Sequence, residues 1–216
     1  MICFMKLLSA ILILAFLVSC APAQNQKSPA AAAQSEVGHK QATENQIQEI
    51  SPEVRDLLAK HGTRISSIHY RYRGPETGSN FHEFYVKGGK IKYKPHRDLK
   101  SLDQPGSYDS IFIDNAAKSA QSYCTEPYCA YKGKKADLNY DEAYIDTIFD
   151  WIDIKKANKA GEEVIDGRNT WKVQTDKGIL WIDTFYGIPL KVDSSGKIYR
   201  FEQVSTNSVQ DADVTP

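Results

Sequence analysis

Residues 178–192 read GILWIDTFYGIPLKV, which is two apolar runs joined by a turn that contains Gly187. The same pattern continues on both sides of this stretch. Further runs at 163–166, 169–175 and 197–204 are separated by Gly-containing turns at nearly regular spacing. Short β-branched and aromatic runs with such turns are typical of antiparallel strands. This pattern therefore predicts a meander of about five strands in the last third of the chain.

The segment before this meander predicts a helix. Asn139 followed by Glu142 is a capping-box pattern at its start. Apolar residues then recur at helical spacing: Tyr144, Ile145, Ile148, Phe149 and Ile152. Lys155 and Lys156 would complement the negative end of this helix.

The first half of the domain begins with another short helix. Ser51 is a good N-cap and Pro52 takes the favoured first position. Val54, Leu57 and Leu58 share one face, and Gly62 is expected to stop the helix.

Strands are expected to follow this helix. Residues 68–73 alternate between apolar and polar, and the runs 81–86 and 91–94 flank a Gly-Gly turn. A second hairpin is expected from 111–113 and 119–124, because Asp-Asn at 114–115 is a turn signal. A helix over 114–123 is the alternative.

The expected order is thus a helix, four to six strands, a helix and about five strands. This is an α+β fold. A long antiparallel sheet must hide one face, and it curls because its strands twist. We therefore expect a curled antiparallel sheet, a half-barrel, with the two helices covering its concave side.

The N-terminus predicts export. Residues 7–18 are apolar except for Ser9 and follow Lys6. A run of this length is short for a bilayer span and fits the apolar region of a signal peptide. Met5 is an alternative start, because Met1–Phe4 precedes the only lysine of this region.

Residues 17–20, Leu-Val-Ser-Cys, look like a lipobox, the cleavage motif of prokaryotic lipoproteins. The resemblance implies cleavage before Cys20, lipidation of its thiol and anchoring to the membrane of a prokaryotic cell envelope. An ordinary secreted protein and an uncleaved membrane anchor are the alternatives. Attached acyl chains hold a protein at a membrane by about 0.8 kcal/mol for each buried CH₂ group.

Four regions follow from these patterns. They are a signal peptide at 1–19, the lipidated Cys20 with a flexible tether at 20–50, a half-barrel domain at 51–206, and a polar C-terminal tail at 207–216. The tether is rich in Ala, Gln, Ser and Glu and has no strand or helix period. As a coil it would span roughly 30 Å. The tail is expected to be loose.

The charge balance argues against two classes of partner, and the cysteine count predicts a disulfide. The 216 residues are 41% hydrophobic and carry 27 basic and 27 acidic side chains, a balance that argues against nucleic acid and against a polybasic membrane patch. Cys124 and Cys129 remain after lipidation of Cys20, which predicts one disulfide in an exported chain. Metal ligation and a redox role are alternatives for this pair.

The chain offers little for catalysis. No nucleophile-elbow, zinc-protease, Walker or dinucleotide motif occurs in the sequence. The five histidines have no ligand spacing, so no metal site is expected. Asp146 and Asp150 could form a carboxylate pair on one helix face, but a solvated face is the simpler interpretation. We expect a protein that is not an enzyme.

The element order and residues 178–192 resemble the outer-membrane lipoprotein-sorting superfamily, which contains LolA, LolB and mycobacterial lipid-carrying lipoproteins. In that family a Trp-x-Asp strand runs through a turn into a Gly-x-Pro-Leu-Lys strand, as Trp181–Asp183 and Gly187–Lys191 do here. The resemblance covers roughly residues 51–216. A lipidated Cys20 fits the family's receptor and lipid-carrying members rather than its soluble carrier.

The resemblance implies a hydrophobic cavity that binds the acyl chains of a lipid or lipoprotein, without catalysis or cofactor. The side chains proposed to line it are Tyr70, Tyr72, Phe84, Tyr93, Phe149, Trp171, Trp181 and Phe201. The alternative is a structural or interaction lipoprotein with a packed core, which would expose an apolar patch to another envelope protein.

Overall fold

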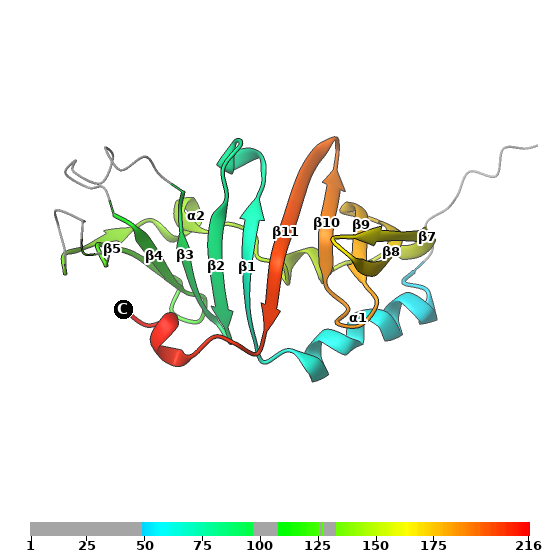
Figure 1. Cartoon of the computed structure of the whole chain (residues 1–216), viewed down its shortest axis with the longest axis horizontal. Helices are drawn as coiled ribbons and strands as arrows, with labels where there is room; N and C mark the ends of the chain where they lie inside the picture. The colour runs from blue at the N-terminus through cyan, green and yellow to red at the C-terminus, as the bar shows by residue number, and fades with distance from the viewer. Residues whose placement is uncertain (1–48, 97–107, 126, 128–132) are drawn as a thin grey trace, which may run out of the picture. The chain divides into compact units, whose positions relative to one another are not determined.

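The computed structural model describes residues 49–96, 108–125, 127 and 133–216, all within the unit Glu44–Pro216. The predicted signal peptide, Cys20 and nearly all of the tether lie outside these residues, as does Cys129. Figure 1 shows the arrangement of the elements. Within the described part of the chain, no helix combines the length and apolarity required to cross a membrane.

The core of the fold is one antiparallel sheet in the strand order β6-β5-β4-β3-β2-β1-β11-β10-β9-β8-β7. The strands of the first half are β1 (Ser67–Arg73), β2 (His82–Lys87), β3 (Lys90–Lys94), β4 (Ser110–Asp114), β5 (Ser119–Tyr123) and β6 (Lys135–Leu138). The second half supplies β7 (Ala157–Ile165), β8 (Arg168–Thr175), β9 (Gly178–Asp183), β10 (Pro189–Ser194) and β11 (Lys197–Thr206).

Among the described residues, two α-helices, α1 (Pro52–Arg64) and α2 (Tyr140–Ala143), accompany this sheet, with short 3-10 turns at η1 (Pro75–Thr77), η3 (Asp150–Ile152) and η4 (Asp211–Asp213). The strands turn from nearly upright at β1 and β2 to nearly horizontal at β7 and β8 (Figure 1). The sheet is therefore curled and open, and the predicted α+β half-barrel is confirmed.

The first and last strands lie side by side in the middle of the sheet. β11 pairs with β1, which brings Tyr72 opposite Phe201, and β1 pairs with β2, which brings Tyr70 opposite Phe84. All other neighbouring strands follow one another in sequence. The predicted hairpin between β4 and β5 is confirmed: the Asp114 carboxylate accepts hydrogen bonds from the backbone N–H groups of Ala116 and Ala117.

Helix α1 packs on the concave face through Val54, Leu57 and Leu58, all of which are buried. It passes the expected stop at Gly62 and ends at Arg64. The guanidinium group of Arg64 donates to the carbonyl of Phe185 and lies 4.4 Å from the centre of the Phe185 ring. The connection between β9 and β10 thus holds the last turn of the helix.

That connection explains why residues 178–192 are distinctive. The buried Asp183 carboxylate accepts hydrogen bonds from the N–H groups of Phe185 (2.9 Å) and Tyr186 (2.6 Å). The Gly187 N–H donates to the Asp183 carbonyl at 2.9 Å. The turn carries Gly187 against helix α1, where the backbone φ of 73° suits glycine.

The predicted helix over 139–156 is mostly absent. Asn139 does cap it, accepting from the N–H groups of Asp141 and Glu142, but α2 ends at Ala143. Residues 144–156, here called the strap, continue as an irregular segment. The Asp150 carboxylate accepts from the backbone N–H of Thr147 at 2.6 Å and from its hydroxyl at 2.7 Å. This side-chain acceptor replaces the helical carbonyl partner, as Asp does in turns.

The end of the chain is packed where a loose tail was expected. Val209 and Val214 are buried, and the Val209 N–H donates to the Ser67 hydroxyl. Asp211 forms an ion pair with Lys87 at 3.1 Å. Two valines in a polar segment carry too weak a pattern to reveal this contact from sequence.

Candidate functional site

The concave face carries a cluster of aromatic side chains from four adjacent strands. We call Tyr70, Tyr72, Phe84, Tyr93 and Phe201 the inner aromatic cluster. The Phe84 ring lies 5.3 Å from Tyr70 and 5.1 Å from Tyr93 between ring centres, both stacked. Phe201 meets Tyr70 at 5.5 Å, edge to face. Strand alternation places all five on one face, as the sequence predicts.

The strap lies on this cluster. Ile148 is fully buried, and Trp151 and Ile154 are 7% exposed. In Figure 1 the yellow-green chain after α2 passes behind the central strands. Together with helix α1, the strap fills the concave side, so the aromatic rings contact the chain's own side chains.

Few polar contacts tie the strap region to the sheet. The Tyr93 hydroxyl donates to the carbonyl of Ala143 at 2.9 Å, and the Ile148 N–H donates to the Tyr70 hydroxyl at 3.2 Å. Farther along, the Lys177 ammonium donates to the carbonyl of Asp150 at 2.5 Å. The Asp176 carboxylate accepts from the N–H groups at 155 and 156 at 3.1 and 3.3 Å. Between these hydrogen bonds, the strap contacts the sheet through apolar side chains.

Burial keeps the tyrosine hydroxyls of this site protonated. It raises the pKa of Tyr93 to about 12 and that of Tyr70 further above its ordinary value. Burial, together with a hydrogen bond to the Asp150 carboxylate, also raises the pKa of Tyr144. These hydroxyls therefore serve as hydrogen-bonding groups and not as bases at neutral pH.

One buried donor in the strap is unsatisfied. The Trp151 ring packs 4.6 Å from Tyr199, centre to centre, and its Nε1 has no hydrogen-bond partner. A buried N–H without an acceptor costs about 1–3 kcal/mol. The strap is thus packed on the sheet with one donor unpaired.

The remaining predicted site residues divide between the two faces. Phe149 and Trp171 are partly buried and pack against the inner core. Trp181 does not join them: it lies between Leu180 and Ile182, which face inward, and therefore points to the outer face. There its Nε1 donates to Glu163 at 2.5 Å, and Lys191 stacks on its ring. Its placement in the cavity does not fit this register.

Cys124 is 2% exposed at the end of β5. Because Cys129 lies outside the described residues, the Cys124–Cys129 disulfide stays a prediction. Among the described residues no group of three or more His, Cys, Asp or Glu side chains could hold a metal ion.

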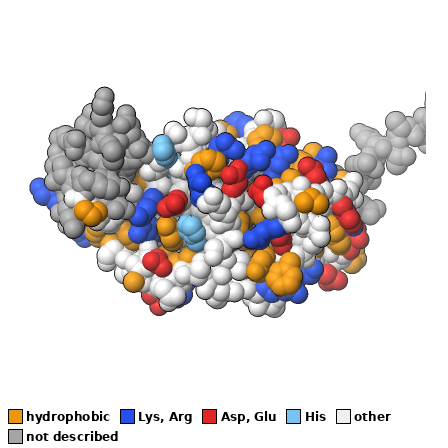
Figure 2. Space-filling view, viewed as in Figure 1, with side chains coloured by type: hydrophobic (Ala, Val, Ile, Leu, Met, Phe, Trp, Pro, Cys, Tyr) orange, Lys and Arg blue, Asp and Glu red, His pale blue; other side chains and the backbone are white. Residues whose placement is uncertain are grey.

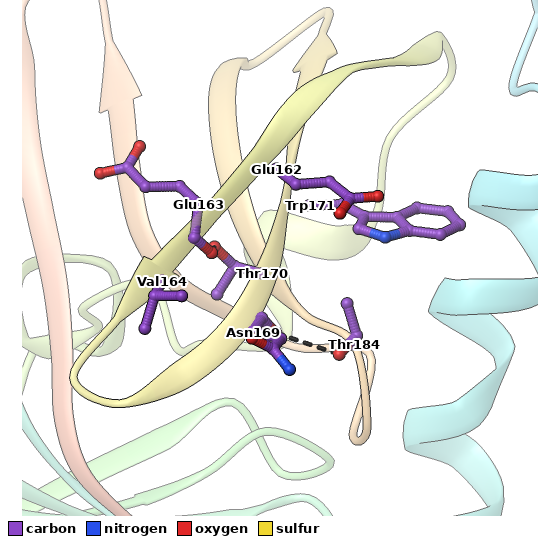
Figure 3. Close-up of a pocket in the computed structure, with 7 residues that line it drawn as sticks. All are labelled: Glu162, Glu163, Val164, Asn169, Thr170, Trp171 and Thr184. Carbon is purple, nitrogen blue, oxygen red and sulfur yellow. Dashed lines mark hydrogen bonds between the residues drawn. The ribbon is translucent and has the colours of Figure 1, made fainter.

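A pocket of about 460 Å³ lies at the end of the β7–β8 hairpin (Figure 3). It is lined by Glu162, Glu163, Val164, Asn169, Thr170, Trp171 and Thr184. Its carboxylates already have partners in the chain, since Glu162 pairs with Lys159 and Glu163 accepts from Trp181. Val164 in its lining is 61% exposed, and Phe185 on the neighbouring turn is 60% exposed. No pattern in the sequence predicts this pocket.

No protein-family model matches the chain, and no curated protein matches it. Solved structures do show similarity. MucB aligns with 14% identity and a TM-score of 0.45, over 77% of this chain and 63% of MucB. The chain thus spans less than two thirds of that protein.

LprF from Mycobacterium bovis aligns with 14% identity and a TM-score of 0.40, over 78% of this chain and 99% of LprF. The LolA superfamily protein NE2245 from Nitrosomonas europaea aligns with 10% identity and a TM-score of 0.32, over 76% of this chain and 97% of that one. The likeness to all three is a partial one of fold.

Proposed function

We propose that this chain is a non-catalytic envelope lipoprotein that binds the acyl chains of a lipid or lipoprotein on its concave face. The observation that carries the proposal is the inner aromatic cluster covered by a non-helical strap. Between its polar ties, the strap contributes apolar side chains such as Ile148 and Ile154 to the core. Acyl chains would make the same kind of contact, because burial of apolar surface is non-directional.

Binding would then exchange the strap for acyl chains. The strap and the acyl chains would cover a similar apolar area of the aromatic rings. The main free-energy cost of binding would therefore be the loss of the hydrogen bonds between the strap region and the sheet. A typical hydrogen bond contributes about 0.5–1.5 kcal/mol to stability. Removing the hydrogen bonds of the Tyr70 and Tyr93 hydroxyls should therefore favour acyl binding, while the apolar surface of the aromatic rings stays unchanged.

The double variant Y70F/Y93F tests this exchange. We expect it to bind a fluorescent fatty acid about tenfold more tightly than the parent and to lose about 2 kcal/mol of unfolding free energy. Both effects follow from the loss of the hydrogen bonds to Ile148 and Ala143. Fluorescence titration measures the affinity, and urea denaturation measures the stability.

Y85F is the matched control, because the Tyr85 hydroxyl lies on the outer face and donates to Glu83 at 3.3 Å. It should leave probe affinity unchanged. If Y70F/Y93F is destabilised and binds the probe no better than Y85F does, the strap is a fixed part of the core and the exchange is wrong.

A second candidate function is a packed interaction lipoprotein with a protein partner. The full burial of Tyr70 and Phe84 favours it, and so do the exposed Val164 and Phe185 beside the β7–β8 pocket. This candidate predicts that the parent and Y70F/Y93F both stay free of lipid.

We further propose anchoring through lipidated Cys20 after removal of residues 1–19, with residues 20–50 as the tether. This proposal is supported by the Leu-Val-Ser-Cys pattern at 17–20. Such an anchor would keep the acyl-binding face close to a membrane that holds its ligands.

A further inference from the structure

The outer face of the sheet carries cations in a straight row. Register places Lys172 of β8 opposite Trp181 of β9, Trp181 opposite Lys191 of β10, and Lys191 opposite Arg200 of β11. Arg200 in turn lies opposite Arg73 of β1. Paired residues share a face, so one row crosses five neighbouring strands. We call Lys172, Lys191, Arg200 and Arg73 the outer cationic row.

Three of these four cations form no ion pair with a described residue. Arg73 forms an ion pair with Glu202 at 3.3 Å. Within the described ranges, no acidic side chain lies at ion-pair distance from Lys172, Lys191 or Arg200. All three are partly exposed. In Figure 2, Lys and Arg side chains, with Asp and Glu among them, gather over the upper part of the central strands.

The row is partly held in place by aromatic rings. The ammonium groups of Lys191 and Lys172 lie 3.9 and 5.5 Å from the centre of the Trp181 ring. Trp181 is itself 5% exposed and fixed by Glu163. At the other end, Arg73 lies 4.7 Å from the centre of the Phe81 ring. Ordered cations lose less conformational freedom on binding an anion.

We propose that the outer cationic row docks on the anionic phospholipid headgroups of a bilayer. Strands lie about 4.8 Å apart, so the row is roughly 19 Å long. An extended acidic peptide presents carboxylates on one face about every 6.7 Å, which does not match this spacing. Lipid headgroups diffuse laterally and can match it. The zero net charge of the chain conceals the row, because acidic side chains, among them Asp193 and Glu202 on the same strands, balance it.

Vesicle co-sedimentation tests the docking without the lipid anchor. The protein is the mature chain from residue 20 with C20S, and the vesicles are phosphatidylcholine with or without a quarter of phosphatidylglycerol. We expect binding only to the anionic vesicles, and we expect its loss between roughly 0.1 M and 1 M salt as the Debye length falls to ~3 Å. The variant K191Q/R200Q should bind about thirtyfold more weakly, since each cation near an anionic surface contributes about 1 kcal/mol.

K135Q/K197Q is the control with the same change in net charge, because both lysines are exposed and lie outside the row and the strap. It should bind like the parent. K172Q/R200Q repeats the test while keeping the lysine that stacks most closely on Trp181, and near-ultraviolet circular dichroism checks that each variant is folded.

Equal weakening in the control would mean that net charge alone attracts the protein, which overturns the proposal. So would a parent that ignores phosphatidylglycerol. Binding of a soluble polyglutamate peptide through the same row, without vesicle binding, would assign the row to an acidic protein instead. The outcome does not depend on acyl binding at the concave face, since neither the row variants nor the control changes a residue of the strap or of the inner aromatic cluster.

Discussion

Replacing Gly187 with alanine is expected to destabilise the protein by roughly 3 kcal/mol, from left-handed strain and steric overlap together. Gly187 has a φ of 73°. An added Cβ would overlap the carbonyl oxygen of Leu57 and lie 3.3 Å from that of Leu58. These are backbone atoms of α1, so no side chain can rotate away. Urea denaturation of G187A against the parent measures the effect.

G196A separates strain from overlap. Gly196 has a similar φ of 79°, but an added Cβ would meet nothing within 4 Å. It should cost only about 1 kcal/mol. If G187A and G196A lose equal stability, the β9–β10 connection does not lie as close to α1 as described here.

The second large effect is expected at the centre of the inner aromatic cluster. F84A should lose about 3–5 kcal/mol, the range for truncation of a fully buried aromatic side chain. Phe84 is 0% exposed and contacts Tyr70, Tyr72 and Tyr93. Thermal and urea unfolding measure the loss.

F185A removes the same side chain where it is 60% exposed. It should cost less than about 1 kcal/mol. A loss in F84A no greater than that in F185A would contradict the packing of the strap on the cluster, because a phenylalanine in an open cavity already contacts solvent or ligand.

Most strands and the turns between them could be predicted because their signals are local. Alternation at 68–73 and the turns of the C-terminal meander each depend on neighbouring residues. The pairing of β11 with β1 could not be predicted this way, since it joins the two ends of the domain. The helix predicted over the strap is wrong for a different reason. Ile145, Ile148 and Ile152 have helical spacing, but the Asp150 carboxylate captures the Thr147 N–H and replaces the helix.

The candidate site was predicted in part. Alternation correctly groups Tyr70 with Tyr72, and the structure brings them together with Phe84, Tyr93 and Phe201. Alternation does not show toward which face Trp181 points, because β9 is buried on both faces. The core covers one face, and the side chains of two lysines cover the other. The outer cationic row could not be predicted from the sequence either, because its residues are far apart in the chain and are brought together only by the register of the strands.

The most direct test of acyl binding is lipid extraction from the natively purified mature chain carrying C20S, followed by mass spectrometry. Removing the anchor ensures that any acyl lipid found is held by the domain. We predict acyl lipid at about one molecule or more per chain. A folded, lipid-free protein that also fails to bind a fluorescent fatty acid would contradict the proposal, and the packed interaction lipoprotein would then be the better description.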